Sequence, residues 1–232
     1  MKDTQKLAEA SPVVVFTTYQ FSKGQKLWAF TQMGRSFRKL AAENLKFGYM
    51  LGTGSGRGFS IWPNWQRYAT LTVHTNLTQA KVYLKTNLFI KNLEAKATST
   101  QSSYLQPVQS HGSWAGNNPF YPLAKPLEPG EKVAVLTRAT IRTSKLYEFW
   151  RNVPAVSQST AQAPGLEYQV GIGEWPIVQQ ATMSIWENEE AVRNFAYRMQ
   201  QHKEVVSRTR QRNWYSEELF ARFRILDCEL VN

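Results

Sequence analysis

The sequence predicts an α+β fold in which two ferredoxin-like halves follow each other and close their sheets into one barrel. Three observations support this prediction. Strand-like and helix-like patterns alternate in the order β-α-β-β-α-β, and this order occurs twice within 232 residues. The two occurrences match each other at a fixed offset. Finally, 42% hydrophobic and 13% aromatic residues are enough to build a substantial core.

The spacing of apolar residues predicts each element of the first half in turn. Residues 11–21 are rich in β-branched side chains, as buried strands are. Apolar residues three and four apart predict a helix over 26–43. Asn76 resembles the N-cap of a helix over 77–97, which can form in one or two pieces. Around these helices the sequence predicts extended segments over 44–65, 66–75 and 98–114.

The second half repeats this order after a Pro-rich segment, 122–130, which we interpret as a linker. The two halves therefore comprise residues 1–121 and 131–232. A helix is expected over 144–161, and a longer one begins at Asn188, an N-cap residue followed by two glutamates. The expected strands are 131–140, 165–176, 179–187 and 219–230.

The residues themselves indicate a duplication. Residues 69–84 align with 181–196 without a gap, at an offset of 112 (181 − 69). In this alignment His74 faces Trp186, so we expect a structural or surface role for His74 and not ligation. A ferredoxin-like sheet is covered by helices on one face, and two such sheets can bury their open faces together and remove their edges in a barrel. Both halves belong to one chain, so a homodimer is optional.

The helix that begins at Asn188 carries one apolar face that contains a histidine. Residues three and four apart form this face: Val192, Phe195, Met199, His202, Val206 and Thr209. An inward-facing imidazole is either a hydrogen-bonded core histidine or a ligand of a metal or of haem iron. The spacing alone does not decide between these two interpretations.

Charge and composition restrict the partners and the location. A formal net charge of +11 favours anionic partners such as acidic lipids, nucleic acid or a cofactor that carries carboxylates. The basic residues form no block and match no zinc-finger, RNP or basic-zipper pattern, so no nucleic-acid partner is expected. No apolar run reaches the roughly 18 residues of a membrane span. The single cysteine, Cys228, suits a reducing cytoplasm, and we expect a cytoplasmic protein.

Common catalytic motifs do not account for the chain. The glycines of 52–58 alternate and lack a following Lys-Ser/Thr, which argues against a phosphate loop. The three histidines, at 74, 111 and 202, belong to no H-x-x-x-H or C-x-x-C pattern, so a zinc site has little support. Because C-x-x-C-H is also missing, any haem would be held non-covalently.

Several long stretches resemble the spheroidene monooxygenase family, the carotenoid 2-oxygenases of phototrophic bacteria. They include LTRATIRTSKLYEFWRNVPAV, HKEVVSRTRQRNWYSEELFARF and HGSWAGNNPF. The resemblance extends over about residues 13–227 and is most specific over 197–223. It implies a monooxygenase that uses haem b, has a dimeric-α/β-barrel-like fold and oxidises an apolar, carotenoid-like substrate.

The resemblance also implies roles for residues of the long helix. His202 becomes the expected fifth ligand of the haem iron, with Phe195 and Met199 beside the cofactor. Arg198 and Arg208 flank His202 along the helix and are expected to bind the haem propionates.

Three further residues are expected near the same pocket. His111, in the HGSWAG loop, is the alternative iron ligand or a distal catalytic group. Trp214 is a candidate catalytic residue, and Arg138 a candidate cofactor-binding residue.

Other functions stay open at this point. The same barrel and haem could serve a dehydratase or peroxidase-like reaction, or a haem-binding or haem-transfer protein without turnover. A cofactor-free monooxygenase is the last alternative. The positive charge also suits peripheral contact with an anionic inner membrane, from which a polyene could be extracted. The electron donor is not identified by the sequence.

Overall fold

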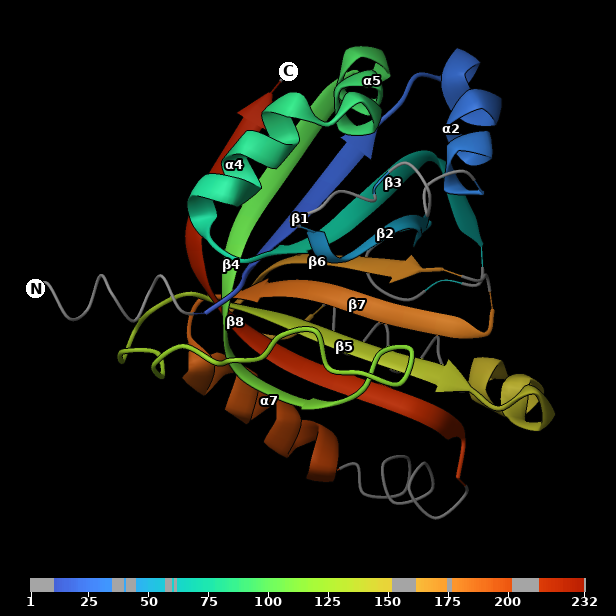
Figure 1. Cartoon of the computed structure of the whole chain (residues 1–232). Coiled ribbons are helices and arrows are strands. Elements are labelled where there is room, and N and C mark those ends of the chain that lie inside the picture. Colours follow the sequence, from blue (N-terminus) through green and yellow to red (C-terminus); the bar gives the residue numbers. More distant parts are fainter. Residues whose placement is uncertain are drawn as a thin grey trace, which may run out of the picture.

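The computed structural model describes residues 11–34, 40, 45–56, 60, 62–151, 162–174, 177–201 and 213–231. Within these residues, eight strands close an antiparallel barrel in the order β1-β3-β2-β6-β7-β5-β8-β4 (Figure 1). The strands are β1 Val13–Gln20, β2 Leu45–Gly54, β3 Pro63–His74, β4 Ser99–Gly112, β5 Val133–Ile141, β6 Leu166–Gly173, β7 Gln179–Trp186 and β8 Tyr215–Val231.

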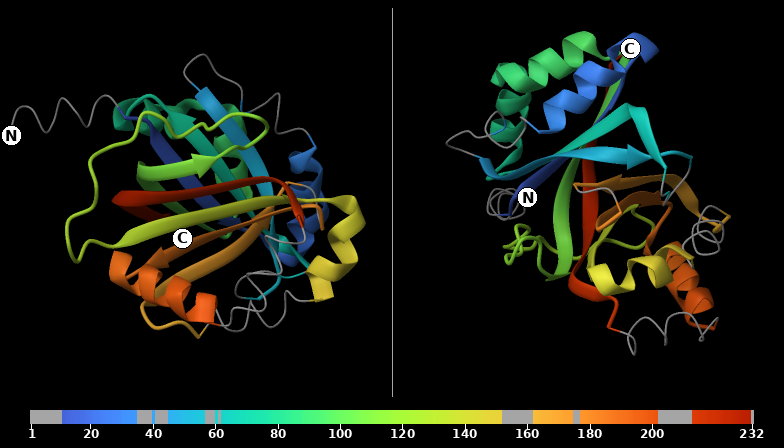
Figure 2. Two further views of the ribbon diagram at one scale, coloured as in Figure 1. Left: turned by 90° about the horizontal axis from the view of Figure 1, so that it is seen from below. Right: turned by 90° about the vertical axis from the view of Figure 1, so that its right-hand side faces the viewer.

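Helices lie on the outside of the barrel, on two opposite sides (Figures 1 and 2). They are α2 Lys26–Met33, α4 Leu77–Thr86, α5 Leu88–Lys96 and α7 Glu189–Gln201. The first three cover strands of the first half, and α7 packs against the second half. None of these helices is long and apolar enough to cross a membrane.

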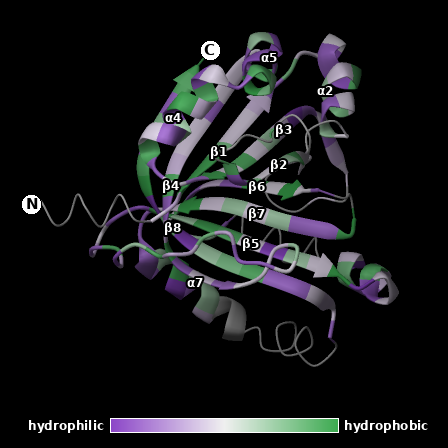
Figure 3. Cartoon of the chain, viewed as in Figure 1, coloured by the Kyte–Doolittle hydropathy of each residue, from purple (hydrophilic) through white to green (hydrophobic). Residues whose placement is uncertain are grey.

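Both halves have the same strand order. The first contributes β4-β1-β3-β2 and the second β8-β5-β7-β6, so the strand nearest the C-terminus of each half pairs with the first strand of that half. This is the order of a ferredoxin-like sheet. Each strand alternates apolar residues that face the barrel interior with residues that face outward, and Figure 3 shows the resulting mixture of apolar and polar positions along the strands.

The two junctions between the halves differ. At one junction β4 and β8 are paired from Thr100↔Val231 to Gly112↔Leu219. At the other, β2 and β6 are paired only at Gly52↔Gly173 and Thr53↔Ile172. The barrel is therefore closed firmly on one side and by a short contact on the other.

Local sequence signals placed the helix starts correctly. The Asn76 side chain accepts a hydrogen bond from the Gln79 amide at 2.9 Å, and the Asn188 side chain accepts one from the Ala191 amide at 2.9 Å. The helix expected over 77–97 forms in two pieces, because the Asn87 side chain caps a new helix.

Several expected elements differ in extent. The helix expected over 26–43 is described as α2 only to Met33, and the expected helix over 144–161 as helical residues 146–151. The long helix is described to Gln201, and β8 begins at Tyr215. Strand β8 therefore starts four residues before the predicted one, because it pairs there with β5.

The segment 122–130 contains no helix or strand. It is nevertheless fixed to the barrel, because Arg224 on β8 donates a hydrogen bond to the Pro126 carbonyl at 2.8 Å. The Ala124 amide donates to the Pro107 carbonyl on β4.

Matching contacts occur at matching places in the two halves. In the first, a His74 ring nitrogen lies 2.9 Å from the Thr72 hydroxyl, and the His74 ring contacts Tyr83 on α4. In the second, the Trp186 indole donates to the Ser184 hydroxyl at 2.9 Å, and the Trp186 ring contacts Phe195 on α7. His74 is fully buried, so of the two roles expected for it the structure excludes the surface role and leaves the structural one.

Candidate functional site

The outer faces of the two half-sheets are filled very differently. On the first half, Tyr19 and Tyr68 are paired across β1 and β3, and both are buried beneath the helices. On the second half, the corresponding pair is Ala139 and Gln180. Both are only partly buried, and neighbouring Thr137 is exposed. The centre of the second outer face thus lacks the aromatic filling of the first.

Apolar clusters lie at the two ends of this second outer face. Beneath α7 lie Val133, Val135, Trp186 and Val192, with Phe195 packed against them. At the other end, Trp214 is buried with Ile141 and Phe149. Small and polar side chains lie between these two apolar clusters. We call this surface the C-half face and define it as Thr137, Ala139, Gln180, Thr182 and Glu218.

Of the predicted iron ligands, the structure describes only His111, which lies beside this face. His111, on β4, is exposed and stacks on Phe220 of β8 at 5.2 Å between ring centroids. Phe220 in turn packs against the cluster beneath α7. His202 and Arg208 lie outside the described residues. Arg198 and Met199 belong to α7, but only their backbone is described.

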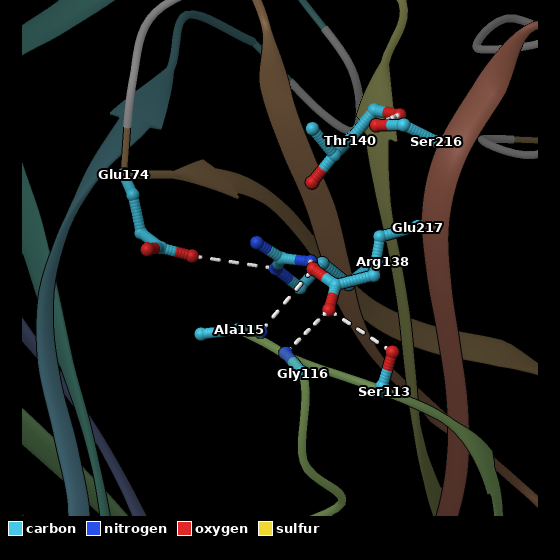
Figure 4. A network of polar contacts seen from close by, with 8 residues as sticks. All are labelled: Ser113, Ala115, Gly116, Arg138, Thr140, Glu174, Ser216 and Glu217. Carbon is cyan, nitrogen blue, oxygen red and sulfur yellow. Dashed lines mark hydrogen bonds and ion pairs between the residues drawn. The ribbon is translucent and has the colours of Figure 1, made fainter.

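Arg138 lies on the opposite side of the sheet, inside the barrel. Its Nη1 donates to Glu217 Oε2 at 2.6 Å, and its Nε donates to Glu174 Oε1 at 3.3 Å (Figure 4). The Arg138 side chain is only 2% exposed. These three residues come from β5, the end of β6 and β8, so the barrel brings them together.

Glu217 is held by three further donors. Its carboxylate accepts hydrogen bonds from the Ser113 hydroxyl and from the amides of Ala115 and Gly116, besides the bond from Arg138 (Figure 4). Burial alone would raise the pKa of Glu217. The hydrogen bonds, led by the one from the Gly116 amide, outweigh burial and hold this pKa below its usual range.

Glu174 is in a different electrostatic situation. Burial raises the pKa of Glu174, and the nearby Arg138 guanidinium offsets only part of that effect. The pKa of Tyr49 is also raised, first by burial and then by the Glu174 charge. Trp114 closes this end of the barrel: its ring lies 4.9 Å from the Arg138 guanidinium and stacks with Tyr49 at 5.4 Å.

A pocket of about 700 Å³ opens where β2 and β6 separate. Its walls come from α2, β2, β3, β6 and the start of β7, and most of its lining is apolar. Phe30 and Trp65 form an edge-to-face pair at 5.3 Å on its wall, and both remain about half exposed. Glu174 and Tyr49 also belong to its lining. We call it the seam pocket.

The structure brings some predicted site residues together and separates others. Phe195 and His111 both lie on the outer side of the second half. His111 stacks on Phe220, and Phe220 and Phe195 pack against the same apolar cluster. Arg138 faces the interior, and Trp214 lies in the cluster at the far end of the C-half face. Among the described residues, no group of three His, Cys, Asp or Glu side chains could hold a metal ion.

Sequence reasoning missed Glu174, Glu217 and the seam pocket. The two glutamates lie in no motif and are 43 residues apart (217 − 174). The only signal for the pocket was the glycine-rich composition of both strands that line it, with Gly48, Gly52 and Gly173 among its wall residues.

Comparisons with known proteins indicate both a family and a fold. The chain is 35% identical over 222 residues to a spheroidene monooxygenase of Rhodobacter capsulatus, an alignment that covers 94% of this chain and 92% of that protein. It is 34% identical to a spheroidene monooxygenase of Cereibacter sphaeroides, over 92% of this chain and 66% of that protein. No family model matches the chain.

A crystal structure of aldoxime dehydratase in complex with butyraldoxime shares the fold. It superposes with a TM-score of 0.61 and 10% sequence identity, and covers 97% of this chain and 84% of that chain. At this identity the similarity concerns the architecture alone.

Proposed function

This chain belongs to the spheroidene monooxygenase family and is therefore an oxygenase, and on that premise we propose that it inserts one oxygen atom into a carotenoid-like polyene. In a monooxygenation, a C–H bond becomes C–OH, the second atom of dioxygen leaves as water, and a reductant supplies two electrons with two protons. The identity to curated relatives over nearly the whole chain is the observation that supports this proposal most directly.

We further propose that haem b binds at the C-half face. The residues present offer room for a flat cofactor between two apolar edges, because Ala139 and Gln180 stand where the first half has two buried tyrosines and apolar clusters lie at both ends of the face. Thr137 and Glu218 on the same face are exposed among the described residues. When bound, haem supplies the activation of dioxygen that amino-acid side chains lack.

The chain's own residues would then hold and shield the cofactor. His202, which follows α7 directly in the sequence, is our proposed iron ligand, and His111 beside Phe220 is the alternative. Phe195 and Met199 would contribute apolar contacts, and Arg198 and Arg208 would pair with propionates. Trp214, buried at the far end of the face, would exclude water there.

Product analysis tests the proposed reaction. The haem-reconstituted protein is incubated with a neutral carotenoid, a two-electron reductant and ¹⁸O₂, and the products are analysed by mass spectrometry. We expect a product that carries one ¹⁸O atom. If protein with a clear haem spectrum forms no ¹⁸O-labelled product under these conditions, the monooxygenase proposal is contradicted.

The ligand assignment has its own test. Absorption spectra are compared for wild type, His202→Ala and His111→Ala after haem reconstitution. We expect the Soret band to be lost or shifted in His202→Ala alone. The same change in His111→Ala alone would assign the ligand to His111 instead.

We also propose that the two halves, 1–121 and 131–232, arose by duplication. The shared strand order, the two asparagine caps and the two matching ring contacts support this proposal. Both half-sheets of the barrel come from one chain, so the barrel itself requires no second copy.

Peripheral contact with an anionic membrane completes the proposal. The net charge of +11 would draw the protein to acidic lipids, and Phe30, Trp62 and Trp65 expose large apolar surfaces. We expect co-sedimentation with vesicles that contain anionic lipid at low salt, and release at high salt because the attraction is screened. Equal binding to purely zwitterionic vesicles would contradict the electrostatic part of this proposal.

A further inference from the structure

We propose that the seam pocket is the binding site for the polyene chain of the substrate, and that it selects a neutral, extended apolar molecule over a fatty-acid anion. This inference rests on the proposed oxygenase function and assigns its substrate to a specific place.

The pocket exists because two strands that could pair do not. Strands β2 and β6 share two paired positions, at Gly52↔Gly173 and Thr53↔Ile172, and then separate. Unpaired strand edges are normally covered or paired, since exposed edges promote aggregation. A pocket of about 700 Å³ lies at this opening, a size that holds a drug-sized molecule or one section of a longer chain.

Its aromatic wall favours an apolar occupant. Phe30 and Trp65 are 47% and 48% exposed although they pack on each other, and Ile177 on the same lining is 40% exposed. Large apolar side chains that gather at one opening commonly mark a binding site. Aromatic faces also stack well on a flat conjugated chain.

Two glycines on the wall differ in what they permit. A Cβ on Gly173 would lie 2.6 Å from the Gln179 carbonyl oxygen, so packing against the backbone requires a glycine there. A Cβ on Gly52 would meet only the Met33 thioether and the Gly173 carbonyl oxygen, at 3.6 to 3.8 Å. No backbone clash requires glycine at position 52, so an added side chain there would project into pocket space.

The lining also discriminates by charge. Among the described residues, the lining contains no Lys or Arg side chain and one carboxylate, Glu174, which is ion-paired to Arg138 behind it. A fatty-acid carboxylate would therefore meet Glu174 and no cation among these lining residues. A neutral chain meets no such penalty.

The pocket leads toward the C-half face. Gln180 belongs both to the pocket lining and to that face, and it pairs across the sheet with Ala139. An extended molecule can thus lie with one section in the seam pocket and another near the proposed cofactor site. A long polyene has the shape that such a route requires.

A pocket-filling substitution tests the inference. Gly52→Leu places a leucine in the pocket, and Gly24→Leu places the same side chain where a Cβ meets nothing closer than 4.0 Å, outside the lining. Binding of a neutral acyclic carotenoid to haem-free protein is measured by the shift of its absorption band. We expect Gly52→Leu to weaken binding at least tenfold and Gly24→Leu to leave it unchanged. Unchanged binding in a folded Gly52→Leu protein would overturn the inference.

A second pair of variants tests the same inference in case Gly52→Leu does not fold. Trp65→Ala removes part of the aromatic wall, and Leu88→Ala removes an exposed apolar side chain from α5 that does not belong to the pocket lining. We expect weaker carotenoid binding in Trp65→Ala only; equal effects would overturn the inference. A saturated fatty acid should fail to displace the carotenoid, and displacement at similar concentration would overturn the charge argument.

These outcomes are separable from those for the reaction. Carotenoid binding that depends on Gly52, without any oxygenated product, would reject the proposed function and retain the site. Oxygenated product formed by Gly52→Leu at the wild-type rate would retain the function and reject the site.

Discussion

His74 and Trp186 occupy the same position in the two halves, yet only His74 can titrate. His74 is fully buried at the end of β3, where it contacts Thr72 and Tyr83. Burial lowers the pKa of His74 to about 4, from an ordinary value of 6.5. The neutral imidazole acts as a flat packing group there, as the Trp186 indole does in the second half.

His74 should make the protein sensitive to mild acid. Its folded pKa lies below its unfolded pKa, so between pH 6.5 and 4 the unfolded chain binds the extra proton. The contribution of neutral His74 to the free energy of unfolding is complete above pH 6.5. It decreases by about 1.4 kcal/mol per pH unit as the pH falls through this window. Urea unfolding from pH 4 to 7.5 should show a smaller acid loss for His74→Phe than for wild type. His111→Phe, at an exposed histidine, is the control and should keep the wild-type slope.

Arg138 is the second residue whose role depends on burial. Replacing it with methionine would leave Glu174 and Glu217 close together in the barrel without their cation. We expect Arg138→Met to lower the free energy of unfolding by about 3–5 kcal/mol. Lys132→Met removes one partner of the exposed pair with Glu167 and should cost at most about 1 kcal/mol. Denaturant unfolding measures the free energy of unfolding of both variants. Similar small losses of this free energy in the two variants would show that the buried network contributes little to stability.

At the scale of elements, α4 and α7 have equivalent starts and different surroundings. Asn76 and Asn188 each cap their helix with one hydrogen bond of 2.9 Å to the amide three residues on. Helix α4 packs on a large core with α5, whereas α7 packs on a smaller cluster beside the C-half face. A matched pair of substitutions can therefore separate a stability effect from a functional one.

Both capping substitutions should destabilise the protein equally. Asn76→Ala and Asn188→Ala should each lower the free energy of unfolding by about 1 kcal/mol, since each removes one N-cap. Only Asn188→Ala should also weaken haem binding, by up to about fivefold, because α7 leads directly to the proposed ligand. Haem titrations followed at the Soret band measure this difference. Equal weakening in the two variants would count against a role for α7 in haem binding.

At the scale of the whole molecule, the barrel combines a firm side with an open one. The β4–β8 junction is paired along most of both strands, and the β2–β6 junction at two positions. The first half also has its outer face filled with tyrosines, while the second half leaves the centre of its outer face uncovered among the described residues. The seam pocket lies between the two halves and the C-half face lies on the second half, and Gln180 belongs to both.

Hydrogen exchange should report this asymmetry. Amides of β2 and β6 beyond their two paired positions should exchange faster than those of β4 and β8, because local opening there breaks fewer hydrogen bonds. Exchange followed by mass spectrometry of peptides 45–54 and 166–173, against 99–112 and 219–231, measures the difference. Carotenoid binding should slow the first pair and leave the second unchanged. Uniform protection of all four strands would contradict a weak junction.

The sequence by itself determined the local elements and their order. Apolar periodicity located the strands, and Asn76 and Asn188 located helix starts, because both signals act between residues close in the chain. The offset of 112 aligned His74 with Trp186, and each of these rings contacts an aromatic ring on a helix of its own half. Candidate residues such as Phe195 could be assigned to a helix face for the same reason.

Only the tertiary structure decided which distant residues meet. Arg138 lies on β5, Glu217 on β8 and Glu174 directly after β6, and no spacing in the chain encodes their ion pairs. The seam pocket depends on how far β2 and β6 stay paired, a property of barrel closure and of packing around Gly173. Burial then sets the electrostatics, lowering the pKa of His74 and raising that of Glu174. Local patterns fix what each segment becomes, whereas the site arises from long-range packing that only the folded chain defines.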